Sequence, residues 1–267
     1  VLVDQIEQDE HGLVLCMGKG GVGKTTVAAA IAVSLARRGH AVHLTTTDPA
    51  AHLEETLHGT VEGLRVSRID PVQATQEYRD RIIATKGKNL DDVGRANLAE
   101  DLLSPCTEEV AVFHQSSKAV SESRRQFVVI DTAPTGHTLL LLDAAGSYHR
   151  DVMRQMGDTA HLTTPLMRLQ DPQQTKIILV TLAEPTPVAE ARNLQADLER
   201  AGIRPWAWVI NNSLAAAKPS SPFLVTRARR ELPLIDDVAG HYAQRIALTP
   251  LLKDDPVGVD LLAEMAG

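Results

Sequence analysis

Short apolar runs alternate with longer helix-forming segments along most of the chain. Runs of this length, closed by glycine, asparagine or aspartate, are typical of buried strands. They predict strands at residues 13–17, 41–47, 64–70, 125–131, 176–182, 205–213 and 246–250. Residues 22–40 and 186–202 have the composition of helices, and a last helix is expected near the C-terminal end. This alternation predicts an α/β fold, a mostly parallel sheet that helices cover on both faces.

Two stretches interrupt the alternation. Residues 71–125 are mostly polar and helical in character, and a second helical stretch is expected at about 146–172. Residues 215–222 are expected to form a loop, which is too short to link two domains. We therefore predict one domain over residues 1–267, with a helical insertion at about 71–125.

Composition excludes several classes of protein. Apolar residues make up 43% of the chain and aromatic residues only 3%, so the core must consist of Leu, Val, Ile and Ala. The net charge of −7 argues against a general nucleic-acid binder. No apolar stretch is long enough for a membrane-spanning helix, and the acidic start does not resemble a signal peptide. With two cysteines, Cys16 and Cys106, the chain is expected to be cytoplasmic, and its first residue, Val1, suggests a piece of a longer chain.

A glycine-rich loop lies between the first predicted strand and the helix that follows it. Gly18, Gly23, Lys24 and Thr25 satisfy the pattern G-x-x-x-x-G-K-S/T. Such a loop binds phosphates with its backbone N–H groups and the N-terminus of the helix. Lys24 is expected to neutralise the β- and γ-phosphates of ATP, the Thr25 hydroxyl to ligate Mg²⁺, and Thr26 to contact the α-phosphate. The residues expected to contact nucleotide in this loop are Gly20, Gly21, Val22, Gly23, Lys24, Thr25 and Thr26.

Two aspartates follow predicted strands and face alternative interpretations. Asp131 ends the run FVVID, where its carboxylate would hold a Mg²⁺-bound water or, alternatively, cap the next helix. The position at a strand end favours the metal role. Asp48 follows the second strand and would orient and deprotonate the attacking water, or cap a helix that begins at Pro49. Spacing supports both interpretations of Asp48 equally.

A second lysine, Lys19, directly follows the first glycine of the loop. It is either a solvated loop lysine or a cation that reaches a nucleotide bound by a facing domain and stabilises the transferring phosphoryl group. The run GKGGVGKT resembles the deviant Walker A loop of a family of P-loop ATPases that includes partitioning and septum-site ATPases, nitrogenase iron protein and the arsenite-pump ATPases. The resemblance implies that Lys19 crosses a dimer interface and acts in trans.

Other runs narrow this resemblance. TTDPAAHL (46–53) and DTAPTGHTLLLLDAAGSYHR (131–150) are similar to the arsenite-pump ATPases or to their eukaryotic relatives that target tail-anchored proteins. SPCTEE (104–109) and the opening of the chain resemble the second, C-terminal half of the arsenite pump. The resemblance, over essentially the whole chain, implies one half of a tandem pseudo-dimer. It implies as partners the homologous first half or a second copy, a membrane arsenite permease and an arsenic metallochaperone, without nucleic acid, at a cytoplasmic location peripheral to the membrane.

The same resemblance implies a metalloid site for As(III) or Sb(III). These soft ions prefer thiolates. Cys106 matches the family cysteine, and His137 and Ser104 match residues near that site. Considered alone, Cys106 would be a small buried hydrophobe and His137 a helix-end histidine. The remaining thiolates would come from the other half, so this chain alone is expected to bind metalloid poorly, while Cys16 is expected to have a packing role.

The adenine end and the link between the two sites rest on fewer residues. Asn211 or Asn212, and the loop near Pro250, match the family's adenine contacts; the alternative is a turn-forming asparagine pair. Asp131, at the expected nucleotide site, and His137, at the expected metalloid site, are only six residues apart. We therefore expect that a movement of Asp131 caused by the state of the γ-phosphate is transmitted through the intervening segment to His137.

Three functions compete on these observations. The first is a metalloid-stimulated ATPase that energises an arsenite efflux permease. The second is an ATP-driven factor that targets tail-anchored proteins; the sequence lacks a C-x-x-C pair and has only five methionines, which counts against it. The third is a partitioning or septum-site ATPase, against which the acidic C-terminal end argues. A cluster-binding iron protein would need a second suitably placed cysteine.

Overall fold

The computed structural model describes residues 2–48, 53–103, 105–132 and 165–266. Its centre is a seven-stranded sheet in the order β3-β2-β4-β1-β5-β6-β7, and every neighbouring pair is parallel. The strands are β1 (Gly12–Met17), β2 (Val42–Thr46), β3 (Leu64–Arg68), β4 (Phe127–Asp131), β5 (Thr175–Leu182), β6 (Ala207–Ser213) and β7 (Ile246–Pro250). All seven predicted strands are confirmed, with ends that differ by at most two residues, and so is the α/β fold class.

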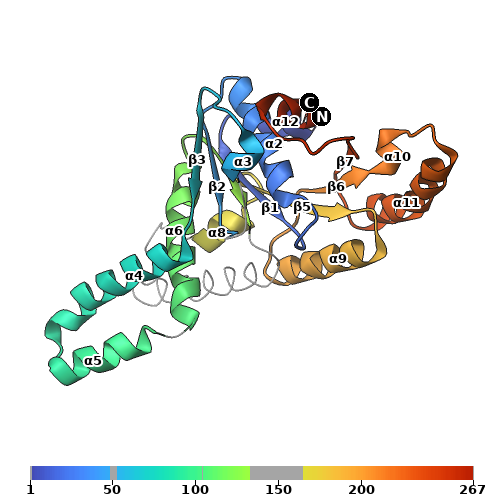
Figure 1. The fold of residues 1–267 in the computed structure, drawn as a ribbon. Coiled ribbons are helices and arrows are strands. Elements are labelled where there is room, and N and C mark those ends of the chain that lie inside the picture. The colour runs from blue at the N-terminus through green and yellow to red at the C-terminus, as the bar shows by residue number, and fades with distance from the viewer. Residues whose placement is uncertain (1, 49–52, 104, 133–164, 267) are drawn as a thin grey trace.

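Helices cover both faces of the sheet (Figure 1). On one face lie α1 (Leu2–Glu7), α2 (Lys24–Arg37), α3 (Leu53–Leu57) and α12 (Val259–Ala266). On the other lie α6 (Pro105–Glu122), α8 (Pro165–Gln170), α9 (Pro185–Arg200) and α11 (Pro222–His241). The helices predicted at 22–40, at 186–202 and near the C-terminal end are therefore confirmed as α2, α9 and α12.

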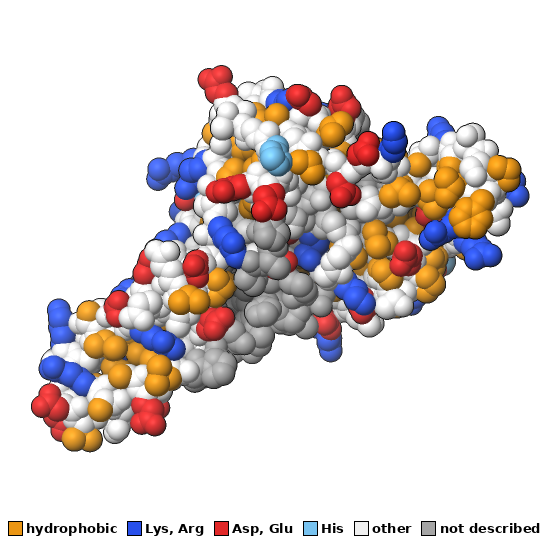
Figure 2. All heavy atoms as spheres, viewed as in Figure 1, with side chains coloured by type: hydrophobic (Ala, Val, Ile, Leu, Met, Phe, Trp, Pro, Cys, Tyr) orange, Lys and Arg blue, Asp and Glu red, His pale blue; other side chains and the backbone are white. Residues whose placement is uncertain are grey.

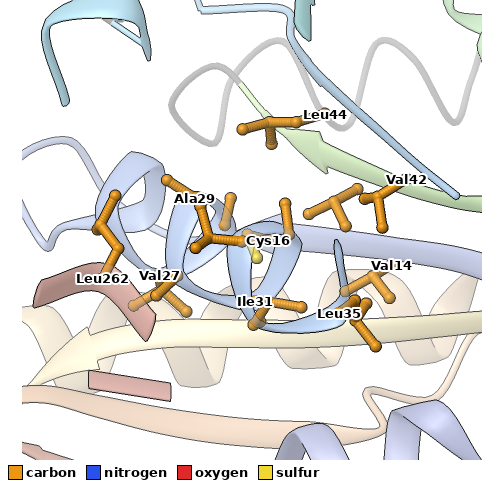
Figure 3. Close-up of a cluster of buried hydrophobic side chains, with 14 of the residues drawn as sticks. Val14, Cys16, Val27, Ala29, Ile31, Leu35, Val42, Leu44 and Leu262 are labelled. Carbon is orange, nitrogen blue, oxygen red and sulfur yellow. The ribbon is translucent and has the colours of Figure 1, made fainter. Parts of the chain in front are cut away.

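Strand β1 shows why the central strands of the sheet are continuous apolar runs. Val14 and Cys16 point into the core beneath α2, whereas Leu13, Leu15 and Met17 point into the core beneath α9 and α11. Because successive side chains of a strand point to opposite faces, a strand buried on both sides must be apolar at every position. Figure 3 shows the first of these cores, which packs β1, β2 and α12 around α2. Cys16 is fully buried there, as its predicted packing role requires.

The residues predicted as a helical insertion, about 71–125, form helices between β3 and β4, and their status as an insertion into a single domain stays a prediction. These helices are α4 (Pro71–Lys86), the 3-10 helix η1 (Gly87–Asn89), α5 (Asp92–Asp101) and α6. Helix α4 begins where the sequence changes from apolar to polar, and the Asp70 side chain accepts hydrogen bonds from the first turn. Helix α5 buries none of its side chains, and α4 and α5 extend away from the sheet (Figure 1). Figure 2 shows apolar side chains gathered over this end of the molecule.

Two predictions for the irregular segments need correction or remain partial. The stretch 215–222 is not wholly a loop, because α10 (Leu214–Ala217) occupies its beginning, with Ser213 accepting a hydrogen bond from the N–H of Ala216. The expected helical stretch at about 146–172 is represented by α8, and the rest of it lies outside the described residues. Among the residues described, no helix is long and apolar enough to cross a membrane.

Candidate functional site

The glycine loop joins the end of β1 to the start of α2, at the carboxyl ends of the parallel strands. Gly18 has a φ of 152°, and a Cβ there would lie 2.3 Å from the carbonyl oxygen of Val180 on β5. Gly23 has a φ of 87°, and a Cβ there would lie 2.1 Å from Nδ2 of Asn211 on β6. These two glycines let the loop pack directly against the neighbouring strands. Between them, Gly20 and Gly21 are exposed and Val22 is buried.

Lys24 is the first residue of α2 and lies inside its own loop. Its side chain is almost completely buried, and Nζ donates a hydrogen bond to the carbonyl oxygen of Lys19 at 3.1 Å. Burial lowers the pKa of Lys24, and the negative charges of Asp131 and Asp48 oppose that shift. The ammonium is therefore enclosed where the loop's N–H groups and the start of α2 favour an anion. Thr26, in the same first turn, is half-buried.

Asp131, the last residue of β4, is fully buried beside the start of α2. Its Oδ2 accepts hydrogen bonds from Thr25 Oγ1 at 2.8 Å and from Thr46 Oγ1 at 3.1 Å. Its Oδ1 has no hydrogen-bond partner. Burial raises the pKa of Asp131 to about 6, although the two threonine hydroxyls and Lys24 favour the charged form.

The group around Asp131 fits a magnesium ion. Mg²⁺ prefers oxygen ligands, usually keeps several waters, and is bound by one or two carboxylates together with substrate phosphates. A buried carboxylate with an unpartnered oxygen and a neighbouring threonine hydroxyl provides that chemistry. The described residues hold no group of three or more histidine, cysteine or acidic side chains that would form an all-protein metal cage. The site therefore fits a cation that arrives with a phosphate ligand.

Asp48 lies at the same edge of the sheet. Strands β2 and β4 pair with Thr46 opposite Asp131, and the N–H of Asp48 donates to Thr46 Oγ1 at 3.0 Å. The N–H of Thr47 donates to the carbonyl oxygen of Asp131 at 2.9 Å. The structure thus brings Asp48, Asp131 and the glycine loop together, and the residues that follow Asp48, 49–52, lie outside the described part.

Lys19 points toward α9 and forms an ion pair there. Its Nζ is 2.8 Å from Oε1 of Glu190, and the two side chains are 41% and 38% exposed. Sequence reasoning missed Glu190, because no motif surrounds it and it is separated from Lys19 by 171 residues.

Asn211 connects the glycine loop to the far strands. Its Nδ2 donates to the carbonyl oxygen of Val22 at 3.0 Å, and its Oδ1 accepts from Thr249 on β7. Asn212 is exposed and has a left-handed φ of 52°, while Pro250 ends β7. The hydrogen bond between Asn211 and Val22 joins β6 to the glycine loop, so it could not have been predicted from the pairing of neighbouring strands. The role of either asparagine at adenine stays a prediction.

The residues predicted to bind metalloid are described only in part. Ser104 and His137 lie outside the described residues. Cys106 lies in the first turn of α6, and its side chain is not among those described. Their assembly into one site therefore stays a prediction.

Comparison with known proteins confirms the resemblance to arsenite-pump ATPases that the sequence motifs indicated. The sequence profile of the family described as Anion-transporting ATPase matches residues 11–170 and 142–267. The chain is 60% identical over its whole length to an arsenical pump-driving ATPase from Escherichia coli and 59% identical over 99% of its length to one from Acidiphilium multivorum. It covers 46% and 45% of those two proteins, so it spans about half the length of these relatives. It is 25% identical to an ATPase GET3 from Malassezia globosa, over 98% of the chain and 91% of that protein.

Proposed function

Because the chain belongs to the anion-transporting ATPase family, we propose that it hydrolyses ATP with Mg²⁺, is stimulated by arsenite or antimonite, and energises metalloid efflux through a membrane permease. One observation carries the proposal: Thr25 of the glycine loop donates to Asp131, whose second oxygen is buried without a partner beside the enclosed ammonium of Lys24. Nucleotide phosphate and Mg²⁺ together complement these charges.

The loop residues would bind the triphosphate. The N–H groups of residues 20–23 would hold the phosphate oxygens, Lys24 would neutralise the β- and γ-phosphates, and Thr26 would bind the α-phosphate. Asn211 would contact adenine while it still holds the loop, because its amide nitrogen carries two hydrogens and one donates to Val22. Asn212 and the loop near Pro250 are the other candidates at the adenine end.

Hydrolysis would then depend on groups around the γ-phosphate. Thr25 and, through a water, Asp131 would hold Mg²⁺, which neutralises charge on the phosphates when it is bound. Asp48 would orient the attacking water and accept its proton. Lys19 would stabilise the transferring phosphoryl group in a facing nucleotide site.

Substitution of Thr25 tests this assignment. We expect Thr25→Ala to lower the rate of Mg²⁺-dependent ATP hydrolysis by at least about 10- to 100-fold, because the loss of a group that merely orients a metal ligand already costs this much and Thr25 is proposed to be a ligand itself. Thr25→Ser keeps the hydroxyl and is the matched control, expected to retain most of the rate. Equal rates for Thr25→Ala and the wild-type protein would contradict the proposal.

The metalloid part of the proposal rests on the relatives named arsenical pump-driving ATPase and on Cys106. A thiolate is the ligand that a soft trivalent ion prefers. Cys106, His137 and Ser104 would contribute this chain's share of the site, and further thiolates would come from a homologous first half or a second copy. Metalloid bound between the halves would favour the closed arrangement in which Lys19 reaches the facing nucleotide.

The remaining partners follow from the same proposal. We infer a membrane arsenite permease and an arsenic metallochaperone as partners, a cytoplasmic location peripheral to the membrane, and no nucleic acid, for which the net charge of −7 is unsuited. The alternative is an ATP-driven targeting factor for tail-anchored membrane proteins. Exposed apolar side chains near α4 and α5, among them Val72, Val93 and Leu103, favour it, but the arsenical pump relatives match at far higher identity.

A further inference from the structure

We propose that Glu190 is a positioning residue that holds Lys19 against its own chain and thereby lowers the basal rate of ATP hydrolysis. This inference rests on the proposed role of Lys19 in a facing nucleotide site. The observation behind it is the ion pair between Lys19 Nζ and Glu190 Oε1, 2.8 Å apart, which joins the glycine loop to α9.

The geometry of the loop directs Lys19 toward α9. Gly18 is fixed by its close approach to Val180 on β5, so the residue that follows it has little freedom of backbone position. Helix α9 packs on the face of the sheet opposite α2 (Figure 1). Lys24 points inward to the carbonyl oxygen of Lys19, whereas the Lys19 side chain points outward to Glu190. The two lysines of one loop therefore serve different surfaces.

Glu190 and a facing phosphate compete for the same ammonium. To bind a phosphate in a facing site, Lys19 would have to break its ion pair with Glu190, which is at hydrogen-bond distance. If the ion pair stayed intact, the negative carboxylate of Glu190 would lie near the negative phosphate and repel it. Either outcome opposes the charge stabilisation expected of Lys19 in the transition state. Since both side chains are more than a third exposed, water screens the ion pair, so the ion pair lowers the rate of ATP hydrolysis only modestly.

The experiment compares single-turnover ATP hydrolysis by the intact protein without metalloid. Glu190→Gln keeps the size of the side chain and removes its charge. We expect it to raise the rate by about 1.5- to 5-fold, the range in which an exposed ion pair shifts an equilibrium. Glu190→Ala should give the same direction. Glu199→Gln, on the same helix but bonded to Gln195, is the matched control and should leave the rate unchanged.

A double substitution distinguishes inhibition by the ion pair from a general effect of removing a negative charge. In a Lys19→Ala background, Glu190→Gln should not change the rate of ATP hydrolysis, because Glu190 is proposed to act only through Lys19. A Glu190→Gln rate equal to the wild-type rate, or the same increase with and without Lys19, would overturn the inference. If Lys19→Ala itself hydrolysed ATP at the wild-type rate, the proposed role of Lys19 would fail instead.

Discussion

At the scale of single residues, the site contains a buried carboxylate, that of Asp131, whose charged form destabilises the folded protein. Asp131 is fully buried, and one of its oxygens lacks a partner, so the folded protein holds its carboxylate at a cost. Burial raises its pKa from 3.8 to about 6. Between these two values the folded protein binds more protons than the unfolded chain, so the free energy of unfolding falls as the pH rises through this window.

Replacing this carboxylate should therefore stabilise the protein while it removes activity. Without nucleotide and Mg²⁺, we expect Asp131→Asn to raise the free energy of unfolding by up to about 3 kcal/mol at pH 8, and by roughly half of that at pH 5. Urea unfolding at both pH values measures the difference, with the exposed Asp254→Asn as control. A variant less stable than the wild-type protein at pH 8 would show that Asp131 does not carry this cost.

At the scale of elements, the glycine loop is held by strands that lie far from it in sequence. Gly18 packs on β5, and Val22 accepts a hydrogen bond from Asn211 on β6. The loop therefore has a fixed shape that depends on the sheet, as a phosphate-binding loop requires if its N–H groups are to converge.

Two glycines of the loop allow a matched test of this packing. Both Gly18 and Gly21 have positive φ angles, but a Cβ at Gly18 would meet the backbone of Val180, whereas a Cβ at Gly21 would meet nothing within 4 Å. We expect Gly21→Ala to cost about 1–2 kcal/mol of stability through backbone strain alone. Gly18→Ala should cost clearly more and also weaken ATP binding. Thermal unfolding and nucleotide titration measure both effects, and equal losses would contradict the packing account.

Elements also show what could be predicted from sequence. The central strands β1, β4 and β5 were predictable because both of their faces are buried, which makes their runs almost continuously apolar. The short helices α1 and α10 were not, since six and four residues span fewer than two helical turns and show no repeating pattern. Helix α1 is fixed by burial of Val3 and Ile6 in the core. The lysine and threonine of the loop follow from a motif, whereas Glu190 is placed by a contact over 171 residues that no local pattern encodes.

At the scale of the whole molecule, the proposed roles of Lys19 and Cys106 need a second half or a second copy of the chain. The chain spans about half the length of the arsenical pump-driving relatives it matches. Lys19 is proposed to act in a facing site, and Cys106 is proposed to share a metalloid with thiolates of another half. The two functions would be linked if metalloid favours closure, and linkage then requires that metalloid and nucleotide each change the affinity of the other.

The two cysteines make this linkage testable. Cys16 lies in the core, and burial raises the pKa of its thiol, so it has neither the exposure nor the charge to bind metalloid. Cys16→Ala is therefore a control for the loss of a thiol at Cys106. Cys106→Ser should leave ATP binding intact, because the proposed nucleotide contacts come from the glycine loop and the ends of the strands.

The most direct test of the account is the rate of ATP hydrolysis by the intact protein, measured with and without antimonite. We expect antimonite to raise the rate of the wild-type protein and of Cys16→Ala, and to raise that of Cys106→Ser weakly or not at all. A wild-type rate that is the same with and without antimonite would contradict the claim that this chain belongs to a metalloid-coupled ATPase.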